Sequence, residues 1–258
     1  MSLVRSDALE HTVSDIQRRF GMRSLHRLVD AGARPPVLPT GYPALDAALG
    51  IGGLPRGRVS ELIGYGSAGQ MAVAARMLAL VQQAGEEAVY VDAMRAVDLD
   101  ALARGGVRFD ALTILRPHTP RQALEALRVL VEGGGAGAIL FDRVNALLSE
   151  PDAPDLLAET IRGLNMALSR SLCALVFLTE AQGAYPAGMT LPHYASIRLV
   201  FEHQAWRIRG RHVAGYTARV TVVKNKLAAP GGSARIDAEV GRSTNAPDAA
   251  FGPQPNRG

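Results

Sequence analysis

The spacing of apolar residues near the N-terminus predicts an amphipathic helix ahead of the main body of the chain. Within residues 7–30, apolar side chains recur after four, three and four positions, as on one face of a helix. This stripe consists of Leu9, Val13, Ile16 and Phe20. Residues 1–30 are expected to form an arm, a helix followed by a short strand, that buries this stripe on its own domain or, as an oligomerisation arm, on a neighbour. The proline-rich residues 31–39 are expected to link it to a core.

From residue 40 onward, short apolar runs alternate with helical patterns, which is typical of an α/β fold. The predicted strands include residues 88–92, 112–115, 138–141 and 172–178, and the predicted helices include residues 120–132 and 156–169. Residues 241–258 are rich in Gly, Pro, Asn and Ala and are expected to be a disordered tail.

Residues 58–80 have the layout of a phosphate-binding loop. An alternating, mostly apolar run at 58–63 predicts a strand, and the Ala/Leu/Met run from Met71 predicts a helix. The turn between them is one that only a glycine-rich sequence forms, and it contains Gly64, Gly66, Ser67 and Gly69. Backbone N–H groups in such a loop can surround phosphates at a helix N-terminus.

The side chains that give this loop its usual chemistry are replaced. The pattern G-x-x-x-x-G-K-[ST] keeps its glycine spacing, but Gln70 occupies the lysine position and Met71 the hydroxyl position. Glutamine carries no charge for the β- and γ-phosphates, and Mg²⁺ prefers oxygen ligands to a thioether. The loop is therefore either a degenerate nucleotide-binding loop or a glycine turn that joins a core strand to a core helix.

Asp142 is a second candidate for nucleotide chemistry. It ends the continuously apolar run at residues 138–141, a pattern in which an aspartate orients Mg²⁺ through water. The alternative is that Asp142 caps the helix that follows, and the sequence does not separate the two.

Composition narrows the class of protein. The 258 residues carry a net charge of +4 at pH 7, which permits nucleic-acid contact without requiring it. Cys173 is the only cysteine, so disulfides within the chain and a cysteine zinc site are excluded, and no metal site is expected. There is no apolar run of membrane-spanning length and no signal-peptide pattern, which predicts a cytoplasmic protein without membrane contact.

Basic residues form two distinctive groups toward the C-terminus. Only two of the 28 basic residues are lysines, Lys224 and Lys226. Arg207, Arg209 and Arg211 alternate and would share one face of a strand. The arginines are a candidate DNA-binding patch, with a solvated sheet face as the alternative. The two lysines, placed within three residues of each other, are interpreted as a retained feature, with chance placement at a solvated strand end as the alternative.

Several motifs together resemble the RecA recombinase family. They are FGMRS, TGYPALDAALGIGGLPRGRVSELIGYGSAG, ILFD, YASIRL and VVKNK, and the resemblance covers about residues 7–240. It implies a RecA-like P-loop core over residues 40–240, with a central, mostly parallel, twisted sheet flanked by helices. It also implies a subunit interface, in which the apolar stripe of the arm docks on the adjacent subunit and Lys224 and Lys226 reach that subunit's ATP.

The resemblance also marks where the family's chemistry is missing. Met94 occupies the position of the glutamate that activates water, and Glu180 that of the glutamine that senses the γ-phosphate. Together with Gln70 and Met71, these replacements predict a pseudo-ATPase with no catalytic residues and no resident cofactor, and thus not an enzyme. Weak residual binding or hydrolysis of ATP or ADP stays open.

DNA binding is expected to be weak. The loop at residues 181–193 is shorter than the family's second DNA loop, and it carries no Lys or Arg to contact phosphates. The contact would then centre on the three arginines.

The resemblance implies a DNA-repair accessory protein of the ImuA type, acting in the SOS response. Such proteins support translesion synthesis through RecA and an ImuB/DnaE-type polymerase assembly. One alternative is a divergent RecA paralogue that still binds ATP and single-stranded DNA in recombinational repair. Another is a regulator of RecA filaments that has no polymerase partner. Assembly into a homo-oligomer stays open in each case.

Overall fold

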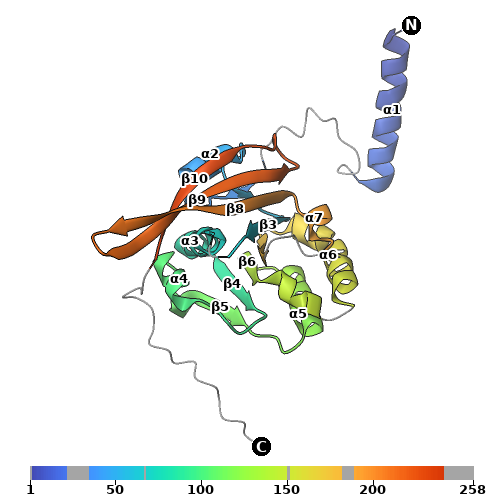
Figure 1. Cartoon of the computed structure of the whole chain (residues 1–258). Helices are drawn as coiled ribbons and strands as arrows, with labels where there is room; N and C mark the ends of the chain where they lie inside the picture. The colour runs from blue at the N-terminus through green and yellow to red at the C-terminus, as the bar shows by residue number, and fades with distance from the viewer. Residues whose placement is uncertain (1, 22–34, 67, 150–151, 182–188, 241–258) are drawn as a thin grey trace, which may run out of the picture. The chain divides into compact units, whose positions relative to one another are not determined.

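The computed structural model describes residues 2–21, 35–66, 68–149, 152–181 and 189–240 (Figure 1). The chain divides into two compact units, residues 1–35 and residues 36–258. In the first unit the predicted helix is present as α1 (Ser2–Phe20). Its stripe exposes Leu9 and Phe20, whereas Val13 and Ile16 are half-buried. The strand predicted after this helix falls at residues 22–34, outside the described residues, so the boundaries of the arm stay predictions.

Within the described residues, the second unit is built on an eight-stranded sheet with the order β10-β9-β8-β3-β7-β6-β4-β5. The strands are β3 (Arg58–Gly64), β4 (Glu87–Asp92), β5 (Leu112–Leu115), β6 (Ala136–Asp142), β7 (Ala174–Glu180), β8 (Ile197–Arg209), β9 (His212–Asn225) and β10 (Ser233–Glu239). The strands from β8 to β5 run parallel to their neighbours, and β9 and β10 add an antiparallel edge. The predicted α/β core with a mostly parallel sheet is confirmed.

Helices cover both faces of this sheet (Figure 1). Those on one face are α3 (Gln70–Gln83) and α4 (Leu99–Arg104), and those on the other are α5 (Pro120–Gly133) and α6 (Ala153–Arg170). The short elements are β1 (Val37–Leu38), α2 (Pro43–Ala48), β2 (Leu54–Pro55), α7 (Leu191–Tyr194) and 3-10 turns at Phe109–Ala111 and Val144–Ser149. No described helix is both long and apolar enough to cross a membrane.

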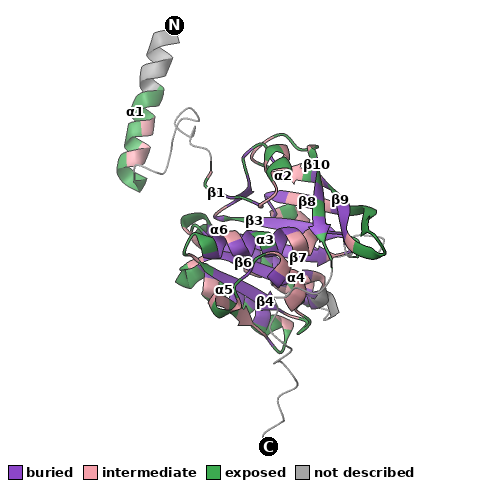
Figure 2. Cartoon of the chain, turned by 90° about the vertical axis from the view of Figure 1, so that its left-hand side faces the viewer, coloured by how far each residue is buried: buried purple, intermediate pink, exposed green. Residues whose placement is uncertain are grey.

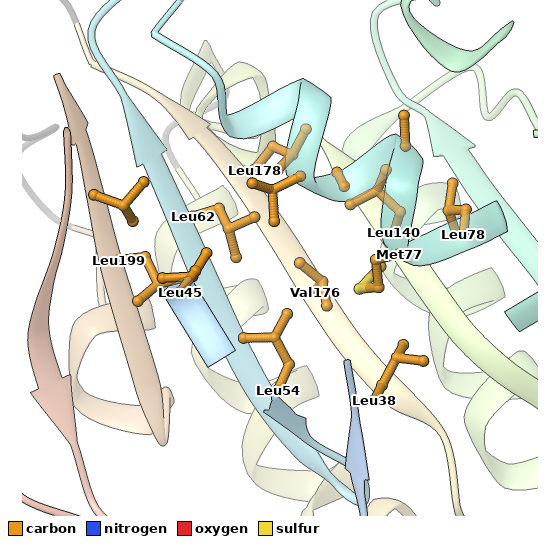
Figure 3. Packing of buried hydrophobic residues seen from close by; sticks show 14 of the residues in the cluster. Leu38, Leu45, Leu54, Leu62, Met77, Leu78, Leu140, Val176, Leu178 and Leu199 are labelled. Atoms are coloured by element: carbon orange, nitrogen blue, oxygen red, sulfur yellow. The ribbon is translucent and has the colours of Figure 1, made fainter. Parts of the chain in front are cut away.

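Alternate side chains of β6 enter two separate cores. Ala138 and Leu140 pack on the α3 side, and Ile139 and Phe141 pack with α5 and α6. Because helices cover both faces, the strand is apolar throughout and lacks the alternation of a half-exposed strand. Figure 2 shows the strands as a buried layer between the helices, and Figure 3 shows Leu140 close to Met77 of α3.

The carboxyl ends of the parallel strands bring chemistry-bearing residues to one edge of the sheet. Gly64 at the end of β3 is in register with Glu180 at the end of β7, and Asp92 of β4 is in register with Asp142 of β6. Ligands of α/β sheets bind outside the carboxyl ends of the strands. This edge is therefore where a ligand site is expected.

Candidate nucleotide-binding site

The loop between β3 and α3 has the strand–turn–helix geometry that its glycines predict. Gly66 and Gly69 adopt left-handed backbone angles, with φ of +64° and +109°, which glycine reaches without steric penalty. Gly69 directly precedes Gln70, the first residue of α3. The first backbone N–H groups of a helix have no partners within it, so this turn can face an anion. Ser67 lies outside the described residues.

The side chain of Gln70 lies against its own loop. Its Nε2 donates a hydrogen bond to the carbonyl oxygen of Gly66 at 2.9 Å. The amide fits beside Gly64 only because Gly64 has no Cβ, which would clash with it. Its Oε1 is buried and accepts no hydrogen bond from the described residues. The position that holds a cation in a phosphate loop therefore carries a neutral amide turned back onto the loop.

A cavity of about 630 Å³ lies beside this loop. One set of lining residues comes from the loop and the strand ends and comprises Gly66, Gly69, Gln70, Asp142, Arg143, Thr179 and Glu180. A second set comes from α4 with the residue that precedes it, from β8 and from β9, and includes Asp98, Arg104, Trp206 and Tyr216. The rings of Trp206 and Tyr216 contact each other edge to face, with centroids 5.9 Å apart. Because loop N–H groups suit phosphates and an exposed aromatic ring suits a base, this cavity is the candidate nucleotide-binding site.

Asp142 lies in the cavity wall, and only 4% of it is exposed. Tyr90 donates its hydroxyl hydrogen to Oδ2 of Asp142 at 2.7 Å. Burial raises the pKa of Asp142, while the hydrogen bond from Tyr90 and the positive charge of Arg143 oppose this rise. Met71, which also lines the cavity and packs against the α3 core, offers no oxygen to a cation. If Mg²⁺ accompanies a nucleotide here, Asp142 is the residue placed to orient it.

Met94 does not belong to the set of cavity-lining residues. It lies in the turn after β4, and 51% of it is exposed. The neighbouring carboxylate, Asp92, is fully buried. It accepts a hydrogen bond from the backbone N–H of Ala96 at 2.9 Å and forms an ion pair with Arg116 at 3.0 Å. Asp92 is therefore engaged in holding the end of β4, and neither residue stands where a base would face the cavity.

Arg143 is a cavity residue that sequence reasoning missed. It follows Asp142, and its backbone is left-handed, with φ of +49°. Its Nε lies 3.7 Å from Oε2 of Glu180 at the end of β7. An arginine directly after a strand-ending aspartate was the available signal. Its pairing with Glu180 depends on the strand order, which the local sequence does not state.

Lys224 and Lys226 come together as their spacing suggested, but away from the cavity. Both ammonium groups donate to the carbonyl oxygen of His193 at 3.1 Å, and Lys224 also donates to that of Pro192. Partial burial lowers the pKa of Lys224, and the neighbouring charges of Lys226 and Arg198 add to this. The pair therefore sits on the carbonyl groups of α7, at the amino end of β8.

The three candidate DNA-binding arginines do not share one strand face. Arg207 and Arg209 lie in β8, but Arg211 lies with Gly210 in the two-residue turn that leads to β9. Gly210 has a φ of +61°, so the strand ends before it. The alternation of side chains between the two faces of a strand, predicted from the sequence, therefore does not extend to Arg211. Arg207 also lies 3.7 Å from the carboxylate of Asp237. The arginines thus mark the tip of an exposed hairpin instead of a flat strip.

Comparison with known proteins covers almost the whole chain. Residues 7–244 match the RecA N-terminal domain family. Protein RecA of Acidothermus cellulolyticus is 36% identical over 256 residues, which is 90% of this chain and 74% of that protein. Protein RecA of Frankia casuarinae is 35% identical over 259 residues, with 91% and 75% covered. Protein RecA of Geobacter sulfurreducens is 33% identical over 254 residues, with 89% and 75% covered.

This similarity overturns the expectation that the chain is a pseudo-ATPase and not an enzyme. RecA proteins that match about 90% of the chain point to an ATP-hydrolysing recombinase. The expectation rested on the side chains of Gln70, Met71, Met94 and Glu180 alone. The backbone of the loop, the cavity and the carboxylate of Asp142 are nevertheless all in place. The family match over residues 7–244 and the similarity to RecA proteins lead to the same conclusion, and the chain belongs to the RecA family.

Proposed function

We propose that this chain is a DNA-repair accessory protein of the ImuA type, which supports damage-induced translesion synthesis by binding RecA and an ImuB/DnaE-type polymerase assembly. The altered phosphate loop on a RecA-type scaffold is the observation that supports this role. Gln70 is hydrogen-bonded back onto Gly66, and the partly buried Met71 packs against the core. These contacts support the interpretation of the loop as a degenerate form of the motif. A family member with this scaffold is suited to join the assemblies of its relatives.

The lysine pair is the surface feature that suits a RecA neighbour. Lys224 and Lys226 donate only to neutral backbone carbonyls in the contacts described above. Phosphate oxygens of a neighbour's ATP are charged acceptors and form stronger hydrogen bonds, so they would displace these carbonyls. The exposed apolar residues of α1, Leu9 and Phe20, would be buried on the neighbouring subunit in such a contact.

A divergent RecA paralogue that binds ATP and single-stranded DNA in recombinational repair is the second candidate. The cavity favours it, because its volume of about 630 Å³ and its two sets of lining residues suit a nucleotide. The hairpin tip, with Arg207, Arg209 and Arg211, would supply weak phosphate contacts to DNA. In either role, we propose that the cavity holds a nucleoside triphosphate.

Co-sedimentation with RecA filaments on single-stranded DNA tests the accessory role. Wild type is compared with a deletion of residues 1–30 and with the double variant Lys224→Ala/Lys226→Ala. We expect wild type to sediment with the filaments and both variants to do so less. The double variant Arg128→Ala/Arg170→Ala, which removes two exposed arginines on α5 and α6, is the charge-matched control and should behave as wild type.

Two outcomes would contradict this role. Equal sedimentation of all variants would remove the lysines and the arm from the interface. Failure of wild type to bind either RecA or a polymerase assembly, together with strand exchange by the chain alone, would replace the accessory role with the second candidate.

A further inference from the structure

A nucleoside triphosphate in the cavity needs a cation beside its phosphates. Asp142 and Glu180 line the same wall and would repel the phosphate charges, and a cation that forms charge-assisted hydrogen bonds to the phosphates would offset this repulsion. Gln70, at the usual lysine position, is neutral and bonded to its own loop. Besides Mg²⁺, a compensating charge can come from another part of the cavity wall.

Three arginines line the cavity among the described residues, and only one stands at a strand end. Arg76 lies further along α3 and packs beside Gly41, where an added Cβ would clash with it. Arg104 is the last residue of α4. Arg143 instead follows Asp142 at the end of β6, next to β7, and lines the same cavity as the phosphate loop.

The backbone of Arg143 sets it apart from an ordinary surface arginine. Its φ of +49° is one of two positive values among the described non-glycine residues, the other being that of Arg95. Side chains with a Cβ disfavour this region, and such residues concentrate at ligand-binding and active sites. The left-handed turn directs the chain sharply after β6, and Arg143 is part of the cavity wall.

The contact between Arg143 and Glu180 is weak enough to be exchanged. Their charged groups are 3.7 Å apart, and 39% and 37% of the two side chains are exposed to solvent. Exposed ion pairs of this kind contribute little, since water screens both partners. A phosphate carries more charge than a carboxylate and accepts two parallel hydrogen bonds from a guanidinium group.

We propose that Arg143 is the phosphate-binding cation of this chain, and that it exchanges Glu180 for the terminal phosphate of a nucleoside triphosphate. This assignment rests on the proposed nucleotide site and names the residue that takes over the charge of the missing lysine. We therefore expect the site to prefer triphosphates over diphosphates, because the assignment pairs the guanidinium group with the terminal phosphate.

Isothermal titration calorimetry of the full chain with Mg·ATP and Mg·ADP tests the assignment. The variant Arg143→Asn removes the charge and suits the left-handed backbone, so the fold is retained. We expect ATP to bind about 10–100-fold more weakly to this variant, as for a lost charged hydrogen bond. ADP binding should change little, and Arg143→Lys should recover part of the ATP affinity. Arg121→Ala, which breaks the exposed ion pair with Asp152, is the control and should bind as wild type.

Each contrary result has a distinct meaning. Unchanged ATP affinity in Arg143→Asn, with circular dichroism showing an intact fold, overturns the role of Arg143 alone. Equal losses for ATP and ADP overturn the contact with the terminal phosphate. Failure of wild type to bind either nucleotide overturns both the nucleotide site and this assignment, while the RecA and polymerase contacts keep their separate test.

Discussion

The hydroxyl of Tyr90 donates a hydrogen bond to Oδ2 of Asp142 at 2.7 Å, from the middle of β4 to the end of β6. The bond fixes the carboxylate before any ligand arrives. Burial and the adjacent charge of Asp142 raise the pKa of Tyr90, so the phenol remains a donor throughout the physiological range. The carboxylate is thereby oriented by the sheet itself and not by a mobile loop.

The raised pKa of Asp142 predicts a pH-dependent stability. Because burial raises this pKa above the ordinary 3.8, the folded chain binds the proton more tightly than the unfolded chain. The resulting contribution to the free energy of unfolding is complete below about pH 4 and is lost as the pH rises through the folded pKa. Urea unfolding across this range should show that the stability of wild type relative to Asp142→Asn falls with rising pH. A constant difference would contradict the burial effect, and Asp110→Asn, at an exposed carboxyl, is the control.

Restoring the lysine of the phosphate loop should strengthen nucleotide binding. In Gln70→Lys we expect the ammonium group to leave the narrow space beside Gly64 and to turn toward the cavity. We expect ATP affinity to rise by about tenfold, as for one added charged hydrogen bond. The same change should also compensate Arg143→Asn. Calorimetric titration with ATP checks both, and Gln83→Lys, at the exposed end of α3, controls for added charge. No gain in either background would show that the loop does not face phosphates.

The hairpin tip should carry most of the DNA affinity. Replacing Arg207, Arg209 and Arg211 by alanine is expected to weaken binding to single-stranded DNA and to flatten its salt dependence. Each lost phosphate contact should reduce the slope of log affinity against log salt by about 0.7. Fluorescence anisotropy with a labelled oligonucleotide measures this slope. The triple variant Arg121→Ala/Arg128→Ala/Arg170→Ala removes exposed arginines elsewhere and should leave the slope unchanged. If both triple variants bind alike, the hairpin is not the DNA contact.

The two loop glycines should differ in their tolerance of a side chain. Gly66 has a φ of +64° and no described atom within 4 Å of an added Cβ, so Gly66→Ala should cost about 1 kcal/mol of stability. Gly69 has a φ of +109°, and its Cβ would lie 3.3 Å from Cδ1 of Ile236. Gly69→Ala should therefore cost about 2 kcal/mol or more. Urea unfolding ranks the two variants, and the reverse order would show that the loop changes its conformation to admit the larger side chain.

The sequence predicted the elements whose apolar pattern is set by burial on the sheet. β6 was expected at residues 138–141 and runs from Ala136 to Asp142, because a strand covered on both faces is apolar at every position. The amphipathic stripe likewise predicted α1. These patterns are local, so the chain order alone reveals them.

What the sequence did not predict depends on contacts between distant segments. Gln70 folds back because Gly64 leaves space for it, and Arg143 meets Glu180 because β6 and β7 are neighbours. The alternating pattern of arginines predicted that Arg211 lies on a strand, but Gly210, directly before it, forms a turn. Judging activity from single side chains failed in the same way, because the cavity is assembled from several elements.

The construction of β6 has a mechanical consequence. Successive side chains of this strand pack against the helices on opposite faces of the sheet, and the strand ends at Asp142, whose carboxylate lies in the cavity wall. Packed interiors resist compression, so a displacement of Asp142 cannot be absorbed on one side of the sheet. A ligand that displaces Asp142 would therefore disturb the packing of the helices on both faces of the sheet. The layer of α5 and α6 would then be coupled to ligand binding at the edge of the sheet.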